Sequence, residues 1–249
     1  MAARLEGKIA LVTGGGQGIG RGTCLALARE GAKVVVAGRT EGKCVAVAEE
    51  IAAFGGIAEP IRCDVTSPDD LSAAIDRTVQ VFGGLTTLVN NAQTVRNGPL
   101  AEATDDDLRV VWESGPLATM HAMQSAFPHL RDAGDAAIVN FGSSTAVRGT
   151  AGFGVYAMAK EAIRGLSRVA AAEWGRHGIR VNVVVPNALS PTAAAFDAAE
   201  PDRLALRQAR IPLGRVGDAE LDIGRAVVGL AGADFTYMSG QTLMLTGGE

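Results

Sequence analysis

The feature that most constrains the fold of this chain is a regular alternation of short apolar runs with longer helical patterns, from one end to the other. The apolar runs predict strands at 8–13, 33–38, 57–62, 86–90, 136–141, 179–185 and 241–245. The segments between them predict helices near 18–30, 41–54, 68–82, 105–131, 153–176 and 217–231. Such alternation predicts a parallel sheet with helices on both faces, and nearly continuous apolar strands fit burial on both faces. We therefore expect an α/β fold, a doubly wound sheet of about seven strands.

The composition fits one large domain with an aliphatic core. Hydrophobic residues make up 47% of the 249 residues and aromatic residues only 4%. No change in composition divides the chain, so residues 1–249 are predicted to form one domain. The least regular stretch is 187–215, which predicts either a substrate lid or a surface excursion. The net charge of −4, without a cluster of basic residues, argues against nucleic-acid binding.

Cysteine and histidine usage argues against a disulfide framework and against metal chemistry. The three cysteines (Cys24, Cys44 and Cys63) are scattered, and the three histidines include no short ligand pair. No apolar run has the ~18 residues of a membrane span. The first residues lack the apolar core of a signal peptide. We expect a cytoplasmic protein without a membrane partner.

A glycine-rich loop joins the first predicted strand to the first predicted helix. It reads TGGGQGIG over residues 13–20. Glycines here allow a sharp turn and let backbone N–H groups approach a pyrophosphate at the helix N-terminus. The spacing departs from the literal G-x-G-x-x-G fingerprint, but the position between strand and helix is the required one. The loop predicts a dinucleotide site and adds these candidate cofactor-binding residues: Gly14, Gln17, Gly18, Ile19 and Gly20.

The end of the second predicted strand bears on which dinucleotide is bound. An acidic residue there would favour NAD, whereas Arg39 favours the 2′-phosphate of NADP. Gln17 in the glycine loop adds no second positive charge. NADP(H) is therefore the predicted cofactor, and NAD(H), with Arg39 on the adenine or in solvent, is the alternative.

Tyr156 and Lys160 form a candidate acid–base pair. Residues four apart share a helix face, so the Lys160 ammonium could lie beside the Tyr156 oxygen and favour the ionised phenol, whose ordinary pKa is ~10. Ser143, on a separate segment, could hydrogen-bond the reacting oxygen. A tyrosine and a lysine at this spacing also occur by chance on amphipathic helices.

Taken together, these motifs resemble the short-chain dehydrogenase/reductase family over nearly the whole chain. The glycine loop, Asp64, Asn90-Asn91-Ala92, Ser143 and Tyr156-x-x-x-Lys160 carry the resemblance, in order and at matching spacing. It implies a Rossmann fold in which Tyr156 is the acid–base, Lys160 lowers the tyrosine pKa and binds the nicotinamide ribose, and Ser143 steadies the substrate oxygen. It also implies a homotetramer or homodimer. Further cofactor contacts are implied for Asp64, Val65, Asn90, Asn91, Ala92, Pro186 and Leu189.

Four positions depart from the family pattern. Gly115 stands where a catalytic asparagine is usual, and Gln93 replaces the last glycine of Asn-Asn-Ala-Gly. Pro186-Asn187 replaces Pro-Gly, where the tolerance of asparagine for positive φ could keep the backbone shape, and Pro191 replaces a threonine. Pro116 predicts a break in its helix that frees the carbonyl of Trp112 for water.

The leading hypothesis is an NADP(H)-dependent oxidoreductase that interconverts a carbonyl and a secondary alcohol, similar to a 3-oxoacyl reductase or a related enzyme. One alternative is a catalytically weak dinucleotide-binding homologue with a sensor or structural role, favoured by Gly115, Gln93 and Pro191. The other is an NAD-dependent alcohol dehydrogenase. The substrate is a small carbonyl or alcohol compound whose identity the sequence leaves open.

Overall fold

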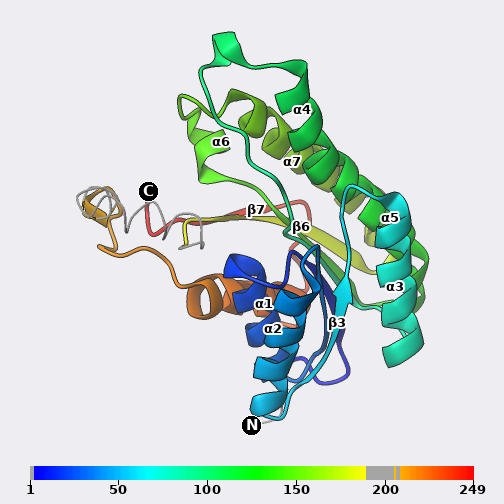
Figure 1. Ribbon diagram of the computed structural model, residues 1–249. Helices are drawn as coiled ribbons and strands as arrows, with labels where there is room; N and C mark the ends of the chain where they lie inside the picture. Colours follow the sequence, from blue (N-terminus) through cyan, green and yellow to red (C-terminus); the bar gives the residue numbers. More distant parts are fainter. Residues whose placement is uncertain (1–2, 189–204, 206–207) are drawn as a thin grey trace.

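A seven-stranded parallel sheet is the centre of the computed structural model, which describes residues 3–188, 205 and 208–249. Its strand order is β3-β2-β1-β4-β5-β6-β7, and every pairing is parallel (Figure 1). The strands are β1 (Ile9–Thr13), β2 (Lys33–Gly38), β3 (Ile57–Arg62), β4 (Thr87–Asn90), β5 (Ala136–Phe141), β6 (Ile179–Pro186) and β7 (Thr242–Leu245). The predicted doubly wound α/β fold is confirmed.

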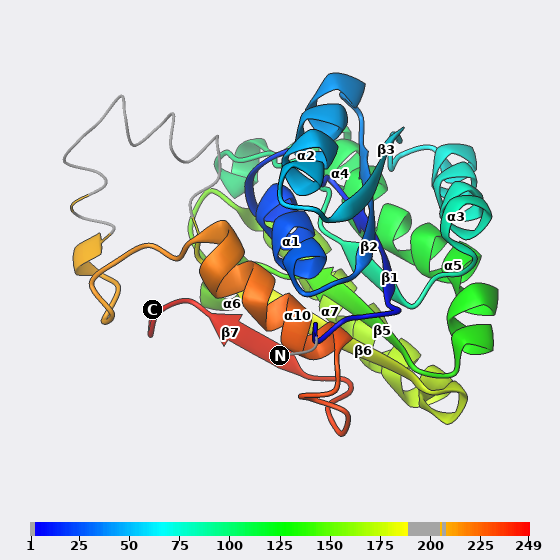
Figure 2. The ribbon, with the colours of Figure 1, turned by 90° about the horizontal axis from the view of Figure 1, so that it is seen from below.

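Helices cover both faces of the sheet, as Figures 1 and 2 show. Side chains of α1, α2 and α10 pack on one face with Val12 and Val34, and those of α3, α5 and α7 pack on the other with Leu11 and Val35. Neighbouring strand residues therefore enter opposite cores, as the two-residue period of a strand requires. The α-helices are α1 (Gly18–Arg29), α2 (Glu41–Ala53), α3 (Pro68–Phe82), α4 (Asp105–Trp112), α5 (Ala118–Ala133), α6 (Ser144–Arg148), α7 (Gly154–Trp174) and α10 (Arg225–Ala231).

Local sequence explains where several helices begin and end. Ser67 caps α3, because its hydroxyl accepts the backbone N–H of Asp70 at 3.1 Å, and Pro68 follows in the first turn. Gly31 lies just past α1 with φ of +91°, a conformation that favours glycine. Thr40 precedes α2 as predicted, but its side chain makes no capping hydrogen bond.

The helix predicted over 105–131 is interrupted. Between α4 and α5 the chain forms a π-helical turn, η2 (Glu113–Leu117), that contains Pro116. Proline lacks the N–H that an α-helix needs at this position, so the backbone widens here. The predicted break at Pro116 is confirmed, and the exposure of the Trp112 carbonyl to water stays a prediction. Two short 3₁₀ turns flank this region of the chain: η1 (Leu100–Glu102) precedes α4, and η3 (Gly175–His177) follows α7.

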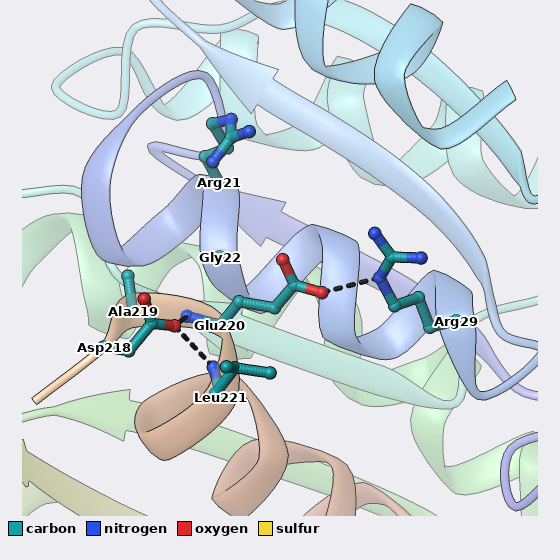
Figure 3. Close-up of a pocket in the computed structure, with 7 residues that line it drawn as sticks. All are labelled: Arg21, Gly22, Arg29, Asp218, Ala219, Glu220 and Leu221. Carbon is teal, nitrogen blue, oxygen red and sulfur yellow. Dashed lines mark hydrogen bonds and ion pairs between the residues drawn. The ribbon is translucent and has the colours of Figure 1, made fainter. Parts of the chain in front are cut away.

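A second π-helical turn, η4 (Ala219–Gly224), leads into α10 and packs tightly on α1. The close-up in Figure 3 shows the shallow pocket between them, with Glu220 reaching Arg29 and Asp218 capping the turn. A Cβ atom on Gly22 would lie 2.4 Å from the Ala219 carbonyl carbon, so a glycine permits this approach. None of the predicted site residues lines this pocket. Among the described residues, no helix is both long and apolar enough to cross a lipid bilayer.

Candidate active site

Of the predicted site residues that the structure describes, most lie where a parallel strand ends, and Tyr156 and Lys160 lie on α7. The chain leaves β1 for β2 on one side, and β4 lies on the other side of β1, so the direction of winding reverses between β1 and β4. In open α/β sheets, ligands bind in the crevice outside such a switch point. The glycine loop follows β1, and Asn91 follows β4, so both lie at this switch point.

The glycine loop has the compact shape that a phosphate cradle requires. Gly14 and Gly18 adopt φ of +66° and +56°, which side-chain-bearing residues rarely adopt. A Cβ atom on Gly20 would lie 2.1 Å from the carbonyl oxygen of Gly14. The loop is therefore restricted to glycine at these positions for reasons of backbone geometry.

Asn91 and Thr13 lock the glycine loop to the end of β4. The Asn91 side-chain amide donates to the carbonyl oxygens of Thr13 (3.0 Å) and Gly14 (3.2 Å). In return, the Thr13 hydroxyl accepts the backbone N–H groups of Asn91 (3.1 Å) and Ala92 (3.2 Å). Both Asn91 and Ala92 thus border the predicted cofactor site, and the Asn91 amide shapes the loop.

The N-terminus of α1 fits a pyrophosphate. Gln17 precedes the helix but makes no side-chain capping hydrogen bond, and the first turn holds no acidic residue. The first N–H groups of a helix lack partners within it, and the helix dipole favours an anion there. Ile19 packs against the core beneath this turn. The residues present therefore suit the phosphates of a dinucleotide.

A lysine that sequence reasoning missed lies beside the glycine loop. Lys43, in the first turn of α2, donates from Nζ to Oε1 of Gln17. Its Cβ would be 3.0 Å from a Cβ atom placed on Gly16. Arg39 is exposed just after β2, in the same region. The loop thus has a cation near it in addition to Arg39, although Gln17 itself carries no charge. In the sequence, the sign of this contact was a basic residue in the first turn of the second predicted helix.

The residues after β3 form a tight acidic turn. The Asp64 carboxylate accepts from the backbone N–H and the hydroxyl of Thr66, and the Asp64 N–H donates to Asp70 at 2.9 Å. Val65 is buried in the core. This turn lies at the carboxyl edge next to β2, where the resemblance implies the adenine.

Tyr156, Lys160 and Ser143 come together from two elements. Tyr156 and Lys160 lie on consecutive turns of α7, with Nζ of Lys160 5.6 Å from the tyrosine ring centre. Ser143 follows β5, and its hydroxyl lies near enough to the Tyr156 phenol to act on the pKa of the phenol. Ser143 also begins α6, a five-residue helix that the sequence patterns did not predict, and its oxygen lies 2.7 Å from the Thr145 hydroxyl. The expected juxtaposition of hydroxyl, phenol and ammonium is present.

The protonation behaviour of the pair differs from the expectation. Burial raises the pKa of Tyr156 to about 12, although the nearby Ser143 hydroxyl acts in the opposite direction. Burial also lowers the pKa of Lys160 to about 7. The Lys160 ammonium donates to the Phe141 carbonyl oxygen at 2.7 Å, so one of its N–H groups is committed to the backbone of β5. The phenol is therefore held in its protonated, proton-donating form.

Asn90 has a structural role in this protein. Its side-chain amide donates to Oδ1 of Asn140 at 2.9 Å, and the Asn140 amide donates to Ser167 Oγ at 2.8 Å. The chain of hydrogen bonds runs through the buried core and ties β4 to β5 and to α7. Asn90 is thus held by its neighbours in the sheet, and the implied contact with the cofactor ribose stays a prediction.

Glu249 joins the end of α6 to the segment after β6. The Glu249 carboxylate pairs with Arg148 at the end of α6 and accepts from the Asn187 amide just after Pro186. None of the described residues other than glycine has positive φ. Asn187 therefore does not adopt the positive φ by which it was expected to keep the backbone shape of a glycine. Leu189, Pro191 and most of the predicted lid lie outside the described residues. The described residues include no group of three or more His, Cys, Asp or Glu placed to hold a metal ion.

Comparison with known proteins assigns the family. The family model described as enoyl-(acyl carrier protein) reductase matches residues 14–249. A 12α-hydroxysteroid dehydrogenase from a Clostridium species is 42% identical over 98% of this chain and 96% of its own length. A 7α-hydroxysteroid dehydrogenase, solved with NADH and 7-oxo glycochenodeoxycholic acid, superimposes with a TM-score of 0.93 at 31% identity over 99% of this chain and 96% of that chain.

A third relative extends the range of cofactors. It is a candidate NAD(P)-dependent gluconate 5-dehydrogenase from Beutenbergia cavernae, with NADP bound at low occupancy. It superimposes with a TM-score of 0.91 at 33% identity, over 100% of this chain and 98% of that chain. A nicotinamide dinucleotide is therefore the cofactor type of these relatives and fits the cradle described above. The chain belongs to the short-chain dehydrogenase/reductase family and is an oxidoreductase that acts on carbonyl and alcohol groups.

Proposed function

We propose that this enzyme interconverts a ring ketone and the corresponding secondary alcohol with NADP(H) as its preferred cofactor. The observation that carries the proposal is the grouping of Ser143, Tyr156 and Lys160 beside the carboxyl end of β5. The preference for NADP(H) rests on two exposed cations, Arg39 after β2 and Lys43 beside the loop, which can receive a 2′-phosphate. NAD(H) use is the alternative outcome.

In the reductive direction, Tyr156 donates its proton to the carbonyl oxygen, a role that suits a phenol held in its protonated form. Ser143 orients the same oxygen from the start of α6. The buried Lys160, in its charged form, stabilises the tyrosinate that proton donation leaves behind. When bound, the nicotinamide supplies or takes the hydride. In the oxidative direction the tyrosinate accepts the alcohol proton.

The proposed substrate class follows from the relatives. The relative that shares 42% identity is named for a hydroxyl group on a steroid, and the structural neighbour holds a 7-oxo bile acid conjugate. A rigid, mainly apolar ring system with a secondary alcohol is therefore the proposed substrate type. A 3-oxoacyl thioester is the comparison substrate. We further propose a cytoplasmic homotetramer or homodimer, in which helices α4, α5 and α7 form one interface.

A substrate panel tests this function. Hydroxysteroids, alicyclic diols and 3-oxoacyl thioesters are each presented with NADP(H) and with NAD(H), and turnover is followed by nicotinamide absorbance. We expect the highest kcat/KM with a ring alcohol or ketone and NADP(H). Cofactor binding without turnover of any panel member would support the sensor alternative instead. A preference for thioesters would reassign the substrate class.

A further inference from the structure

The backbone just before Ser143 is held in place by two hydrogen bonds. The N–H of Gly142 donates to the Val184 carbonyl oxygen of β6 at 2.8 Å. The Phe141 carbonyl oxygen accepts from Nζ of Lys160 at 2.7 Å. Ser143 follows directly and begins α6. The backbone therefore sets the position of Ser143, and the direction of its hydroxyl hydrogen is what remains to be fixed.

The Ser143 side chain meets two polar groups of one residue, Thr145. The Ser143 oxygen accepts the Thr145 backbone N–H at 3.3 Å and lies 2.7 Å from the Thr145 hydroxyl oxygen. The contact with the N–H caps α6 and holds the serine oxygen at the start of the helix. The contact between the two hydroxyl groups is a hydrogen bond in which either can be the donor. Its direction decides where the Ser143 hydrogen points.

The supply of hydrogens and lone pairs favours Thr145 as the donor. Each hydroxyl has one hydrogen and two lone pairs. If Thr145 donates, its N–H and its hydroxyl use both lone pairs of the Ser143 oxygen, and the serine hydrogen is left for another acceptor. If Ser143 donates, the Thr145 hydrogen has no acceptor among the described residues, because its hydroxyl bonds Ser143 alone. The first arrangement forms more hydrogen bonds.

The Tyr156 phenol is the acceptor that the first arrangement leaves for Ser143. The Ser143 hydroxyl acts to lower the pKa of Tyr156, against the effect of burial. A hydroxyl favours an ionised phenol when it donates to the phenol oxygen. The bonds from Thr145 to Ser143 and from Ser143 towards Tyr156 then run in one direction. Hydrogen bonds in such a series polarise and strengthen one another.

The direction of the Ser143 hydrogen matters for the proposed reaction, on which this inference rests. In reduction, negative charge develops on the carbonyl oxygen and then, after proton transfer, on the Tyr156 oxygen. Ser143 stabilises this charge only while its hydrogen points towards it. A serine that donated to Thr145 would present its lone pairs instead, and these oppose the charge.

We propose that Thr145 is a positioning residue whose hydroxyl donates to the Ser143 oxygen and so directs the Ser143 hydrogen to the reacting oxygens. Thr145 itself touches neither the substrate nor the cofactor and acts through Ser143. Its contribution is therefore made in the transition state, and it disappears when the serine hydroxyl is removed.

Thr145→Val tests this role, because valine keeps the branched shape and the N–H that caps α6 and removes only the hydroxyl. We expect kcat to fall about five- to tenfold, as for the loss of one neutral hydrogen bond, with KM changed less than about twofold. Thr145→Ser keeps the hydroxyl and should restore kcat to near the wild-type value. Both variants should melt within about 4 °C of wild type.

Thr150→Val is the matched control. Thr150 donates its backbone N–H to the Thr145 carbonyl oxygen at 2.9 Å, and its hydroxyl makes no hydrogen bond to another described residue. The variant removes a threonine hydroxyl from the same segment without touching Ser143. It should keep wild-type kcat and KM.

A double-mutant cycle separates action through Ser143 from a general loss of structure. Ser143→Ala should lower kcat about 10²–10³-fold, as expected for a lost donor to a developing charge. Thr145→Val added to Ser143→Ala should change the single-turnover rate by less than about twofold, because no serine hydroxyl is left to direct. An equal loss from Thr145→Val in both backgrounds would overturn the proposal. Wild-type kcat in Thr145→Val alone would overturn it as well.

Neutron diffraction supplies a readout that does not depend on turnover. In crystals of the wild-type protein exchanged into heavy water, the deuteron between the two hydroxyl oxygens should belong to Thr145. A Ser143 deuteron that points to Thr145 would overturn the proposal, whatever the activity. Absence of turnover in the wild-type protein would instead contradict the proposed function, and the deuteron would still decide the direction of this hydrogen bond.

Discussion

The Lys160 ammonium donates a hydrogen bond to the Phe141 carbonyl oxygen at 2.7 Å, from α7 to the last residue of β5. Lys160 is only 4% exposed, and burial lowers its pKa to about 7. The ammonium is thus fixed by one backbone acceptor and surrounded by packed atoms. A buried ammonium at neutral pH lowers the stability of the folded protein. Groups with a perturbed pKa of this kind cluster at functional sites, so we expect Lys160 to serve catalysis.

Replacement of Lys160 by methionine should therefore stabilise the protein at low pH. Because the folded pKa lies below the unfolded value of 10.5, the unfolded chain binds the extra proton between about pH 7 and about pH 10.5. Wild-type stability should rise with pH across this window, and the penalty is complete below about pH 7. We expect Lys160→Met to be more stable than wild type at pH 6 by an amount on the order of a few kcal/mol. Urea unfolding at several pH values measures this.

The exposed Lys43 provides the matched control. Lys43→Met also removes one ammonium, but it relieves no burial. The difference in unfolding free energy between wild type and Lys160→Met should shrink as pH rises from about 7 to about 10. Parallel pH profiles for wild type and Lys160→Met would contradict a desolvated ammonium.

Tyr156→Phe should abolish turnover while leaving cofactor binding in place. The phenol is the proposed proton donor, and loss of a positioned acid–base group typically costs ~10²–10⁴-fold in rate. We expect kcat to fall at least about 100-fold in both directions. The dissociation constant for the dinucleotide, measured by fluorescence titration, should change little, because the glycine loop is untouched.

The second of the two tyrosines serves as the control for this substitution. Tyr237 is fully exposed, and Tyr237→Phe should keep wild-type kinetics. If Tyr156→Phe retained more than about a tenth of wild-type kcat, the phenol would not be the proton donor.

The sheet and its order of elements could be predicted because they depend on local patterns. Each apolar run from Lys8 to Leu245 became a strand with bounds within one residue of the prediction, since hydrophobic period and turn residues act over short distances. The five-residue helix α6 was missed, because it is too short to show a period and depends on the Ser143 cap. The π-helical form of η2 reflects Pro116, whose effect as a helix break was predictable although the form was not.

The site was predictable in its residues but not in its contacts. Tyr156, Lys160 and Ser143 follow from spacing and resemblance. The close approach of Gln93 to Gly115 and that of Lys43 to Gln17 depend on how separate elements pack, which spacing along the chain does not encode. The raised pKa of Tyr156 likewise comes from burial in three dimensions, and it reverses the direction expected from a neighbouring ammonium alone.

Arg39 and Lys43 should together set the preference for NADP(H). A 2′-phosphate beside two cations gains charge-assisted hydrogen bonds that a 2′-hydroxyl cannot make. We expect Arg39→Ala to weaken NADPH binding about tenfold or more, with NADH binding changed less than about threefold. Lys43→Ala should act in the same direction with a smaller effect, because Lys43 also bonds Gln17. Calorimetric titration of both cofactors measures these ratios.

High salt supplies an internal check on the same prediction. Exposed charge pairs are screened by ions, so the NADPH preference of the wild type should narrow as ionic strength rises, and the Arg39→Ala variant should respond less. Equal affinities for NADPH and NADH in wild type and in Arg39→Ala would show that Arg39 does not read the 2′ position.

Gly20→Ala should disrupt the cofactor cradle. A Cβ atom at this position would lie 2.1 Å from the Gly14 carbonyl oxygen and 2.6 Å from the Asn91 amide nitrogen, so the bonds between the loop and β4 would have to break. We expect dinucleotide affinity to fall at least about tenfold and stability by about 1–3 kcal/mol. Gly42→Ala in α2 is the control, because nothing lies within 4 Å of its added Cβ. It should be neutral or stabilising by up to ~1 kcal/mol. Wild-type cofactor affinity in Gly20→Ala would show that the loop tolerates a side chain at position 20 and that the close approach to Gly14 does not require glycine there.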